Sequence, residues 1–170
     1  MDRIILLLAR GGVLGLVPKA PGTVGTLGGF PITALLLLSG NFWVYLSGCM
    51  LLVPLSAWIC GEAERILDRE DPGEVVFDEM IAVPICYLSI FALMELQGDG
   101  MPGLNSLFEY KLWWVWALCG FVIFRVFDIW KPGPIDKVQS LQGGWGVTMD
   151  DVLAGLFSGL ILGGGYFLLK

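Results

Sequence analysis

The residues best suited to chemistry lie in one polar stretch, FRVFDIWKPGPIDKVQSLQGGWGVTMDD, residues 124–151. It holds one arginine, two lysines and four of the chain's sixteen acidic residues, between two almost entirely apolar segments. On a helix, Arg125 and Asp128 would share a face. Lys131 would follow on the same stripe before Pro132 ends the helix. An internal ion pair is one reading; two cations and an acid at a helix end favour a phosphate clamp beside a metal ligand.

Two pairs of adjacent acids offer metal ligands. Asp78-Glu79 and Asp150-Asp151 each open an apolar segment. Ionised carboxylates near hydrocarbon are costly unless they are paired or bind a metal, although first-turn acids can also cap a helix. A cap needs only one of Asp150 and Asp151. Neighbouring helical side chains point about 100° apart, so one of the two could bind metal while the other caps or orients it.

A third candidate is the segment PGTVGT, residues 21–26. Gly22 and Gly25 would let the backbone approach a ligand closely around Thr23, and amides at the start of the next helix would favour an anion. The wider segment, residues 17–29, is dense in proline and glycine, so we expect a structured loop there and no regular helix. The simpler alternative is a plain loop entering a helix.

Composition narrows the chemistry of these groups. The chain has no histidine, which excludes mechanisms based on imidazole, and its formal charge of −6 argues against a nucleic-acid partner. The four cysteines lie in apolar runs without metal-ligand spacing and are expected to be inert. Ligation by oxygen alone suits Mg²⁺ or Mn²⁺. Carboxylates that hold such an ion beside Arg and Lys are the groups that phosphoryl transfer needs.

The elements that position these groups are expected to be membrane helices. Hydrophobic residues make up 56% of the chain and charged residues 15%, against roughly 45–50% and about 25% in soluble domains. The mean hydropathy is +0.76. We predict one all-α domain over residues 1–170, an integral membrane bundle of about five crossings. The expected crossings are residues 25–39, 42–60, 75–97, 107–127 and 152–169.

Two further helices are expected outside these crossings. Residues 3–17 should form a short interfacial helix, which is retained because no small-residue cleavage site follows it. Residues 61–70 should form a solvated helix that ends before Asp71-Pro72-Gly73. Gly155, Gly159 and Gly163 give the last crossing a smooth face for close helix packing, either within the chain or in a homo-oligomer.

Counting five crossings places three polar regions, residues 18–26, 61–79 and 125–151, on one membrane face. Eight of the ten basic residues fall on that side, and only Lys111 and Lys170 fall opposite. The positive-inside rule therefore predicts that this face, with its polar loops, is cytoplasmic. A small ion- or proton-coupled transporter subunit is the alternative class, but its charges should be spread along the depth of the bundle.

The chain resembles the phosphatidylglycerophosphatase A family in four ordered motifs. They are APGTVGTLGG (20–29), VFDEMIA (76–82), FRVFDIWKPGPID (124–136) and GGWGVTMDDVLAG (143–155). The resemblance runs from about residue 18 to about residue 160, with departures in loops 61–74 and 97–110. It implies a Mg²⁺-dependent lipid phosphatase of the bacterial inner membrane, which converts phosphatidylglycerophosphate to phosphatidylglycerol and inorganic phosphate.

By matching motif positions, nine residues would carry the family's polar site: Thr23, Asp78, Glu79, Arg125, Asp128, Lys131, Asp136, Asp150 and Asp151. Our working hypothesis gives the metal to Asp78, Glu79, Asp128 and one of Asp150 and Asp151. Arg125 and Lys131 would grip the phosphate, with Thr23 and Asp136 also on the substrate side. Amides from Gly22 to Gly25 would stabilise the transition state. The nucleophile is either a metal-activated water or a carboxylate.

Overall fold

The computed structural model describes residues 1–170 and contains helices and no strands. Four helical spans are long and apolar enough to cross a membrane: α3 (Phe42–Leu67), α4 with α5 (Phe77–Leu96), α7 (Trp113–Trp130) and α9 (Gly144–Leu169). The first predicted crossing corresponds to α2 (Pro21–Leu37), which is apolar but only 17 residues long. The all-α membrane class is confirmed, and the number of crossings stays a prediction.

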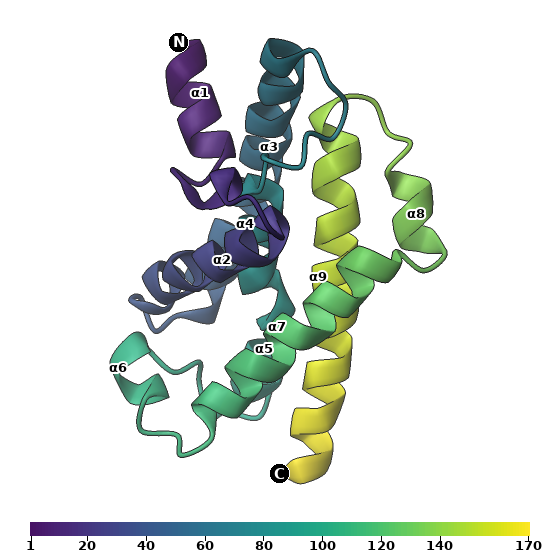
Figure 1. Ribbon diagram of the computed structural model, residues 1–170. Coiled ribbons are helices and arrows are strands. Elements are labelled where there is room, and N and C mark those ends of the chain that lie inside the picture. Colours follow the sequence, from purple (N-terminus) through teal and green to yellow (C-terminus); the bar gives the residue numbers. More distant parts are fainter.

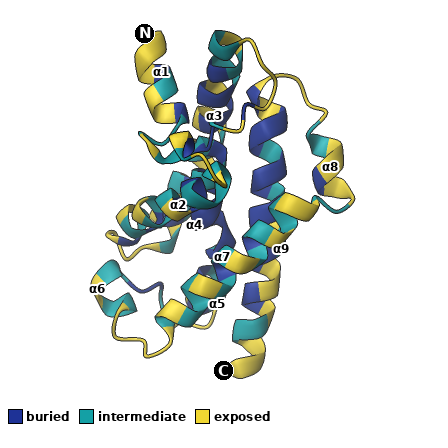
Figure 2. Cartoon of the chain, viewed as in Figure 1, coloured by how far each residue is buried: buried dark blue, intermediate teal, exposed yellow.

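Helix α4 is the centre of the bundle. It packs against α2, α3 and α9, while α7 crosses α9 obliquely (Figure 1). Buried residues gather on α4 and on the faces of α3 and α9 that meet it, whereas the outer faces are exposed (Figure 2). Those outer faces carry large apolar side chains such as Leu51 and Ile129, 71% and 72% exposed. Exposed apolar surface of this kind suits contact with lipid.

The second long span is interrupted. Helix α4 (Phe77–Cys86) ends at Tyr87 and α5 (Leu88–Leu96) continues beyond it. Pro84 has no backbone N–H to continue the α-helical ladder, and Tyr87 N–H donates to the Pro84 carbonyl in a tighter turn. The Tyr45 hydroxyl on α3 donates to the same carbonyl at 2.8 Å. The buried Tyr45 side chain therefore provides a hydrogen bond to a backbone carbonyl close to the point where α4 ends and α5 begins.

The glycine face of α9 packs within the chain. A Cβ built at Gly155 would lie 3.0 Å from the Ala82 carbonyl oxygen, and one at Gly159 would lie 3.0 Å from that of Cys86. Gly155, Gly159 and Gly163 are all buried in this contact with α4 and α5. The predicted close packing is confirmed and occurs within the chain, where α4 and α5 cover this face.

Shorter elements differ from their predicted bounds. In place of one helix over residues 3–17, the chain forms α1 (Asp2–Ala9) and a 3₁₀ turn, η1 (Leu14–Leu16). The polar residues 61–67 continue α3 without a break, and Asp68 ends that helix with φ of 50°. Two short helices, α6 (Leu104–Leu107) and α8 (Pro134–Val138), lie in the connections. The fourth crossing begins at Trp113, later than predicted.

Two corrections concern the candidate site. The glycine-rich segment is helical, because α2 begins at Pro21 and only residues 17–20 form a loop. Proline at the first helical position has its φ preset for a helix and loses no hydrogen bond there. Helix α9 begins at Gly144, so Asp150 and Asp151 lie about two turns inside it. They do not open this helix, and the capping alternative is wrong for them.

Candidate functional site

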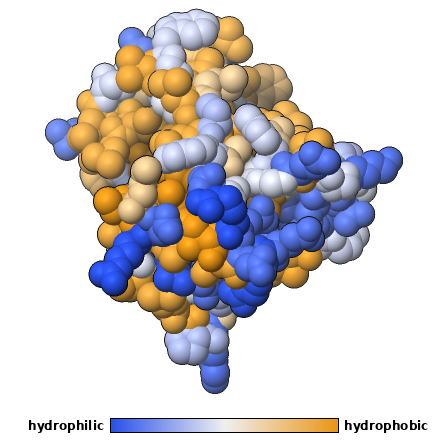
Figure 3. Space-filling model, turned by 90° about the horizontal axis from the view of Figure 1, so that it is seen from above, coloured by the Kyte–Doolittle hydropathy of each residue, from blue (hydrophilic) through white to orange (hydrophobic).

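A polar pocket of about 420 Å³ lies where four helices approach one another. Its walls are the start of α2, the first turn of α4, the end of α7 and the second and third turns of α9, together with the loop after α3. Viewed from the end of the molecule at which α9 begins, hydrophilic side chains gather in one area among apolar ones (Figure 3). The predicted convergence of three separated polar regions is confirmed.

The pocket is strongly acidic. Two of its lining residues are basic, Arg125 and Lys131, and six are acidic: Asp71, Asp78, Glu79, Asp128, Asp150 and Asp151. Carboxylates held together in an apolar bundle require neutralisation. The two basic side chains provide part of it through direct ion pairs.

Arg125 makes most of the polar contacts in one half of the pocket. Its Nη1 lies 3.0 Å from Glu79 Oε2 and 2.5 Å from Asp128 Oδ2. The same nitrogen donates to the Thr26 hydroxyl at 3.3 Å, and that hydroxyl lies 2.9 Å from Glu79 Oε2. Arg125 Nε is buried without a hydrogen-bond partner. One guanidinium thus joins α7 to α4 and α2.

Lys131 forms the ion pair in the other half of the pocket. It ends α7 in the left-handed conformation, with φ of 45°, and its Nζ lies 2.6 Å from Asp150 Oδ2 on α9. Partial burial acts to lower the pKa of Lys131, but the hydrogen bond and charge of Asp150 outweigh it and raise this pKa above its ordinary value. The ammonium is therefore charged at neutral pH.

Asp78 and Asp151 have no cationic partner. They are 3% and 4% exposed, and they face one pocket from α4 and α9. Asp78 Oδ1 accepts the N–H of Glu79, and Asp150 Oδ1 accepts the N–H of Asp151, both at 2.9 Å. Two buried carboxylates that line one pocket without a counter-ion are unfavourable, and a divalent cation would neutralise them.

This donor set fits a hard divalent ion such as Mg²⁺, which prefers carboxylate oxygens and retains water ligands. Asp78 and Asp151 are the pair with no competing cation. Glu79, Asp128 and Asp150 line the same pocket and are held by Arg125 and Lys131. No three acidic or cysteine side chains converge closely enough to hold a metal ion in this conformation. Full ligation would require local side-chain movement.

Eight of the predicted site residues line the pocket: Gly22, Asp78, Glu79, Arg125, Asp128, Lys131, Asp150 and Asp151. Three others do not. Thr23 is absent from the lining, and Gly25 is buried where an added Cβ would overlap Val76. Asp136 is exposed on α8, away from the pocket. These three placements in the substrate site are not supported by the geometry.

Sequence reasoning missed Thr26 and Asp71. Thr26 lies four residues after Gly22, so the two share a face of α2, whereas Thr23 points about 100° away from Gly22. The i, i+4 spacing would have indicated Thr26 if the segment had been recognised as helical. Asp71 lies in the loop between α3 and α4 and lines the rim. Its acidic type, in a loop with no distinguishing spacing, gave no such signal.

Comparisons with known proteins agree with the motif resemblance. The family model described as phosphatidylglycerophosphatase A matches residues 7–165. The phosphatidylglycerophosphatase A of Escherichia coli K12 is 33% identical over 157 residues, which cover 92% of this chain and 80% of the relative. The protein of the same name from Haemophilus influenzae Rd is 32% identical over 159 residues, 93% of this chain and 86% of the relative.

A third relative carries a different name. A Bacteroides thetaiotaomicron protein, provisionally named a phosphatidylinositol-3-phosphatase, is 32% identical over 167 residues, 92% of this chain and 90% of the relative. That name also describes a phosphatase that acts on a lipid phosphate. No solved structure matches the chain.

Proposed function

The chain belongs to the phosphatidylglycerophosphatase A family, and on this premise we propose that it hydrolyses phosphatidylglycerophosphate to phosphatidylglycerol and inorganic phosphate. The observation that carries the proposal is the acidic pocket with Arg125 and Lys131 at one end of an apolar helical bundle. A lipid substrate brings a phosphate and hydrocarbon together, as this site does. A transporter with charges spread through its depth would not concentrate them at one end.

Mg²⁺ is the proposed cofactor, supported by the donor chemistry of the pocket. Asp78 and Asp151 would hold it, with Glu79, Asp128 or Asp150 completing the carboxylate set. When bound, the ion would neutralise the phosphate oxygens and lower the pKa of a bound water. The two buried carboxylates would then have the counter-ion that the protein itself does not provide.

Phosphate recognition is assigned to Arg125, Lys131 and the start of α2. Both cations are paired with carboxylates in this conformation, so their charges are positioned before a ligand arrives. If a cation occupied these carboxylates, Arg125 and Lys131 would be free to bind phosphate oxygens. Ala20, Pro21 and Gly22 line the pocket at the N-terminus of α2, where backbone N–H groups favour an anion.

The attack on phosphorus takes one of two forms, by a water or by a pocket carboxylate. In both, the bond between phosphorus and the glycerol oxygen breaks, and the leaving oxygen takes a proton to give phosphatidylglycerol. Attack by water releases inorganic phosphate directly, whereas attack by a carboxylate gives an acyl phosphate that a water must then hydrolyse to release inorganic phosphate. Acid quenching with substrate labelled in its terminal phosphate separates the two. Label retained on the protein shows a carboxylate nucleophile, and its absence under single-turnover conditions supports water.

We place the pocket at the cytoplasmic face of the bacterial inner membrane, because eight of ten basic residues fall on its side of the crossings. The test is labelling by a membrane-impermeant maleimide in a Cys119→Ser background, since the other three thiols are buried. Asp136→Cys should react only from the cytoplasmic side and Lys111→Cys only from the opposite side. The reverse pattern would overturn the orientation.

The enzymatic proposal is tested with purified protein in detergent or vesicles. Phosphate release from phosphatidylglycerophosphate should require Mg²⁺, stop with EDTA and return when Mg²⁺ is added in excess. Phosphatidylinositol 3-phosphate is tested as an alternative substrate, because the Bacteroides relative is named a phosphatase of that lipid. No Mg²⁺-dependent release from phosphatidylglycerophosphate would contradict the proposal, and faster release from the inositol lipid would change its substrate.

A further inference from the structure

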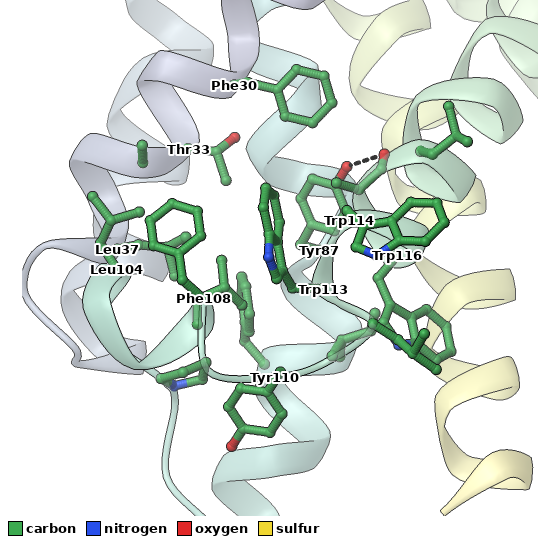
Figure 4. A pocket seen from close by; sticks show the side chains of 18 of the residues that line it. Phe30, Thr33, Leu37, Tyr87, Leu104, Phe108, Tyr110, Trp113, Trp114 and Trp116 are labelled. Carbon is green, nitrogen blue, oxygen red and sulfur yellow. Dashed lines mark hydrogen bonds between the residues drawn. The ribbon is translucent and has the colours of Figure 1, made fainter.

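A second, larger cavity of about 890 Å³ lies between α2 and α7, with α6 across its far end. Of its 24 lining residues, 20 are hydrophobic. Phe30 and Leu37 of α2 face Trp113 and Trp116 of α7, and Phe108 approaches from the segment after α6 (Figure 4). A void of this size and lining suits a hydrocarbon ligand, because water gains few hydrogen bonds there.

The polar groups along the inner part of this cavity are already satisfied by the protein. The Thr33 hydroxyl donates to the Gly29 carbonyl at 2.9 Å, and the Tyr87 hydroxyl donates to the Ala117 carbonyl at 2.9 Å. The second bond is the dashed line in Figure 4. Tyr110 and Lys111 lie at the far rim, before α7 begins. No buried hydrogen-bonding group is left for a polar ligand, so the interior selects apolar chains.

The cavity lies farther along the same two helices that line the polar pocket. Gly22 on α2 and Arg125 on α7 line the pocket, whereas Leu27 and Phe121 line the near end of the cavity. At 1.5 Å per residue, the pocket residue and the cavity residue of each helix are only about 6–8 Å apart along the helix axis. Phe30 and Phe121 stack between α2 and α7 with ring centroids 6.3 Å apart. The polar and apolar sites therefore share two walls.

The cavity is long enough for part of an acyl chain. From Leu27 to Leu37, both of which line it, α2 rises about 15 Å along its axis. Leu27 and Leu118 line the cavity and are 50% and 54% exposed, so its wall is open to the side on which lipid would lie. Phe108 and Trp113 pack edge to face at 4.9 Å near its far end.

We propose that this cavity holds an acyl chain of the phospholipid substrate while the terminal phosphate lies in the polar pocket. The inference rests on the proposed function and deepens it, because it assigns residues of α2 and α7 to recognition of the lipid tail. The chain enters sideways between α2 and α7 from the surrounding leaflet. The glycerol and phosphodiester groups of the head span the short distance between the two sites.

The test compares long-chain and short-chain substrates. Ala34→Trp and Ala117→Trp each fill part of the cavity, and Leu160→Trp introduces the same side chain on the exposed face of α9, outside the cavity. With dioleoyl phosphatidylglycerophosphate, kcat/KM should fall by about tenfold or more in the two cavity variants. With the dihexanoyl substrate it should stay within about twofold, and Leu160→Trp should leave both substrates unchanged.

Direct labelling of the wild-type protein provides the second measurement. A phosphatidylglycerophosphate analogue with a diazirine in its acyl chain should cross-link to residues 27–37 and 113–121, and unlabelled dioleoyl substrate should compete. Equal losses for long and short substrates in the cavity variants, or no loss, would overturn the inference. So would cross-linking that substrate does not displace. If the wild type hydrolyses neither substrate, the proposed function itself fails.

Discussion

Arg125 on α7 lies 3.0 Å from Glu79 on α4, and this ion pair joins two of the helices that form the polar pocket. Both side chains are largely buried, 16% and 15% exposed. A buried pair of this kind is costly to break, because the remaining charge is left without a partner. The same guanidinium reaches Asp128 within its own helix, so one side chain sets the positions of two carboxylates.

Arg125→Lys is expected to lower kcat by about 10²–10³-fold while the helical content is retained. Lysine keeps the charge but lacks the planar guanidinium, whose Nη1 contacts Glu79, Asp128 and Thr26 and whose fork of donors suits a phosphate. Phosphate release and far-UV circular dichroism are the measurements. Arg65→Lys is the matched control, since Arg65 is exposed and pairs only with Glu62. Activity within about twofold of wild type for Arg125→Lys would remove this residue from phosphate recognition.

Asp78→Asn and Asp151→Asn are each expected to abolish the stabilisation of the protein by Mg²⁺. Ligand that binds only the folded state raises the melting temperature, so wild-type protein in detergent should melt higher with millimolar Mg²⁺ than with EDTA. Both variants should lose this shift, together with most turnover. Asp68→Asn, an exposed acid at the end of α3, should keep both. A full Mg²⁺ shift in either pocket variant would exclude that carboxylate as a ligand.

Lys131→Met is expected to destabilise the protein by roughly 1–3 kcal/mol, because Asp150 remains buried without its partner. Adding Asp150→Asn should recover much of that stability but not the activity. The raised pKa of Lys131 means that the pair is fully formed below the ordinary lysine pKa. Its contribution should disappear as the pH rises through the folded-state value. Thermal melts across pH, with activity assays in parallel, are the measurements. If Lys131→Met and the double variant were equally stable at every pH, the pairing of Lys131 with Asp150 would be contradicted.

Thr26→Val and Thr23→Val separate the helical geometry of α2 from the loop expected on sequence grounds. Thr26 contacts Glu79 and Arg125, so its valine variant should lose about tenfold or more in kcat/KM. Thr23 does not line the pocket, and its variant should stay near wild type. Values of kcat and KM for the two variants, measured in parallel, show which threonine contributes to the site. A larger loss for Thr23→Val would reverse the assignment.

The amino-acid sequence by itself determined the membrane class, the apolar segments and most of the polar site. Apolar runs of sufficient length admit few alternatives to helices, because backbone polar groups in lipid must be satisfied within the segment. The predicted count of five crossings placed Gly22, Asp78, Arg125 and Asp150 at one end, and in the structure these four residues line one pocket. The acidic residues of the motifs were recognisable as site candidates because an ionised carboxylate next to apolar segments is costly unless it is paired or binds a ligand.

Tertiary structure decided which of those residues meet. Glycine and proline between residues 17 and 29 favour a loop by local propensity, but close packing of Gly25 on Val76 requires the absence of a side chain and holds the segment as a helix. That helix turns Thr26 toward Arg125 and Thr23 away. The helical course of α9 from Gly144 likewise placed Asp150 beside Lys131 and left Asp151 in the same pocket as Asp78 without a cation. Side-chain direction depends on where each helix begins and on what packs against it, and neither is encoded in local spacing alone.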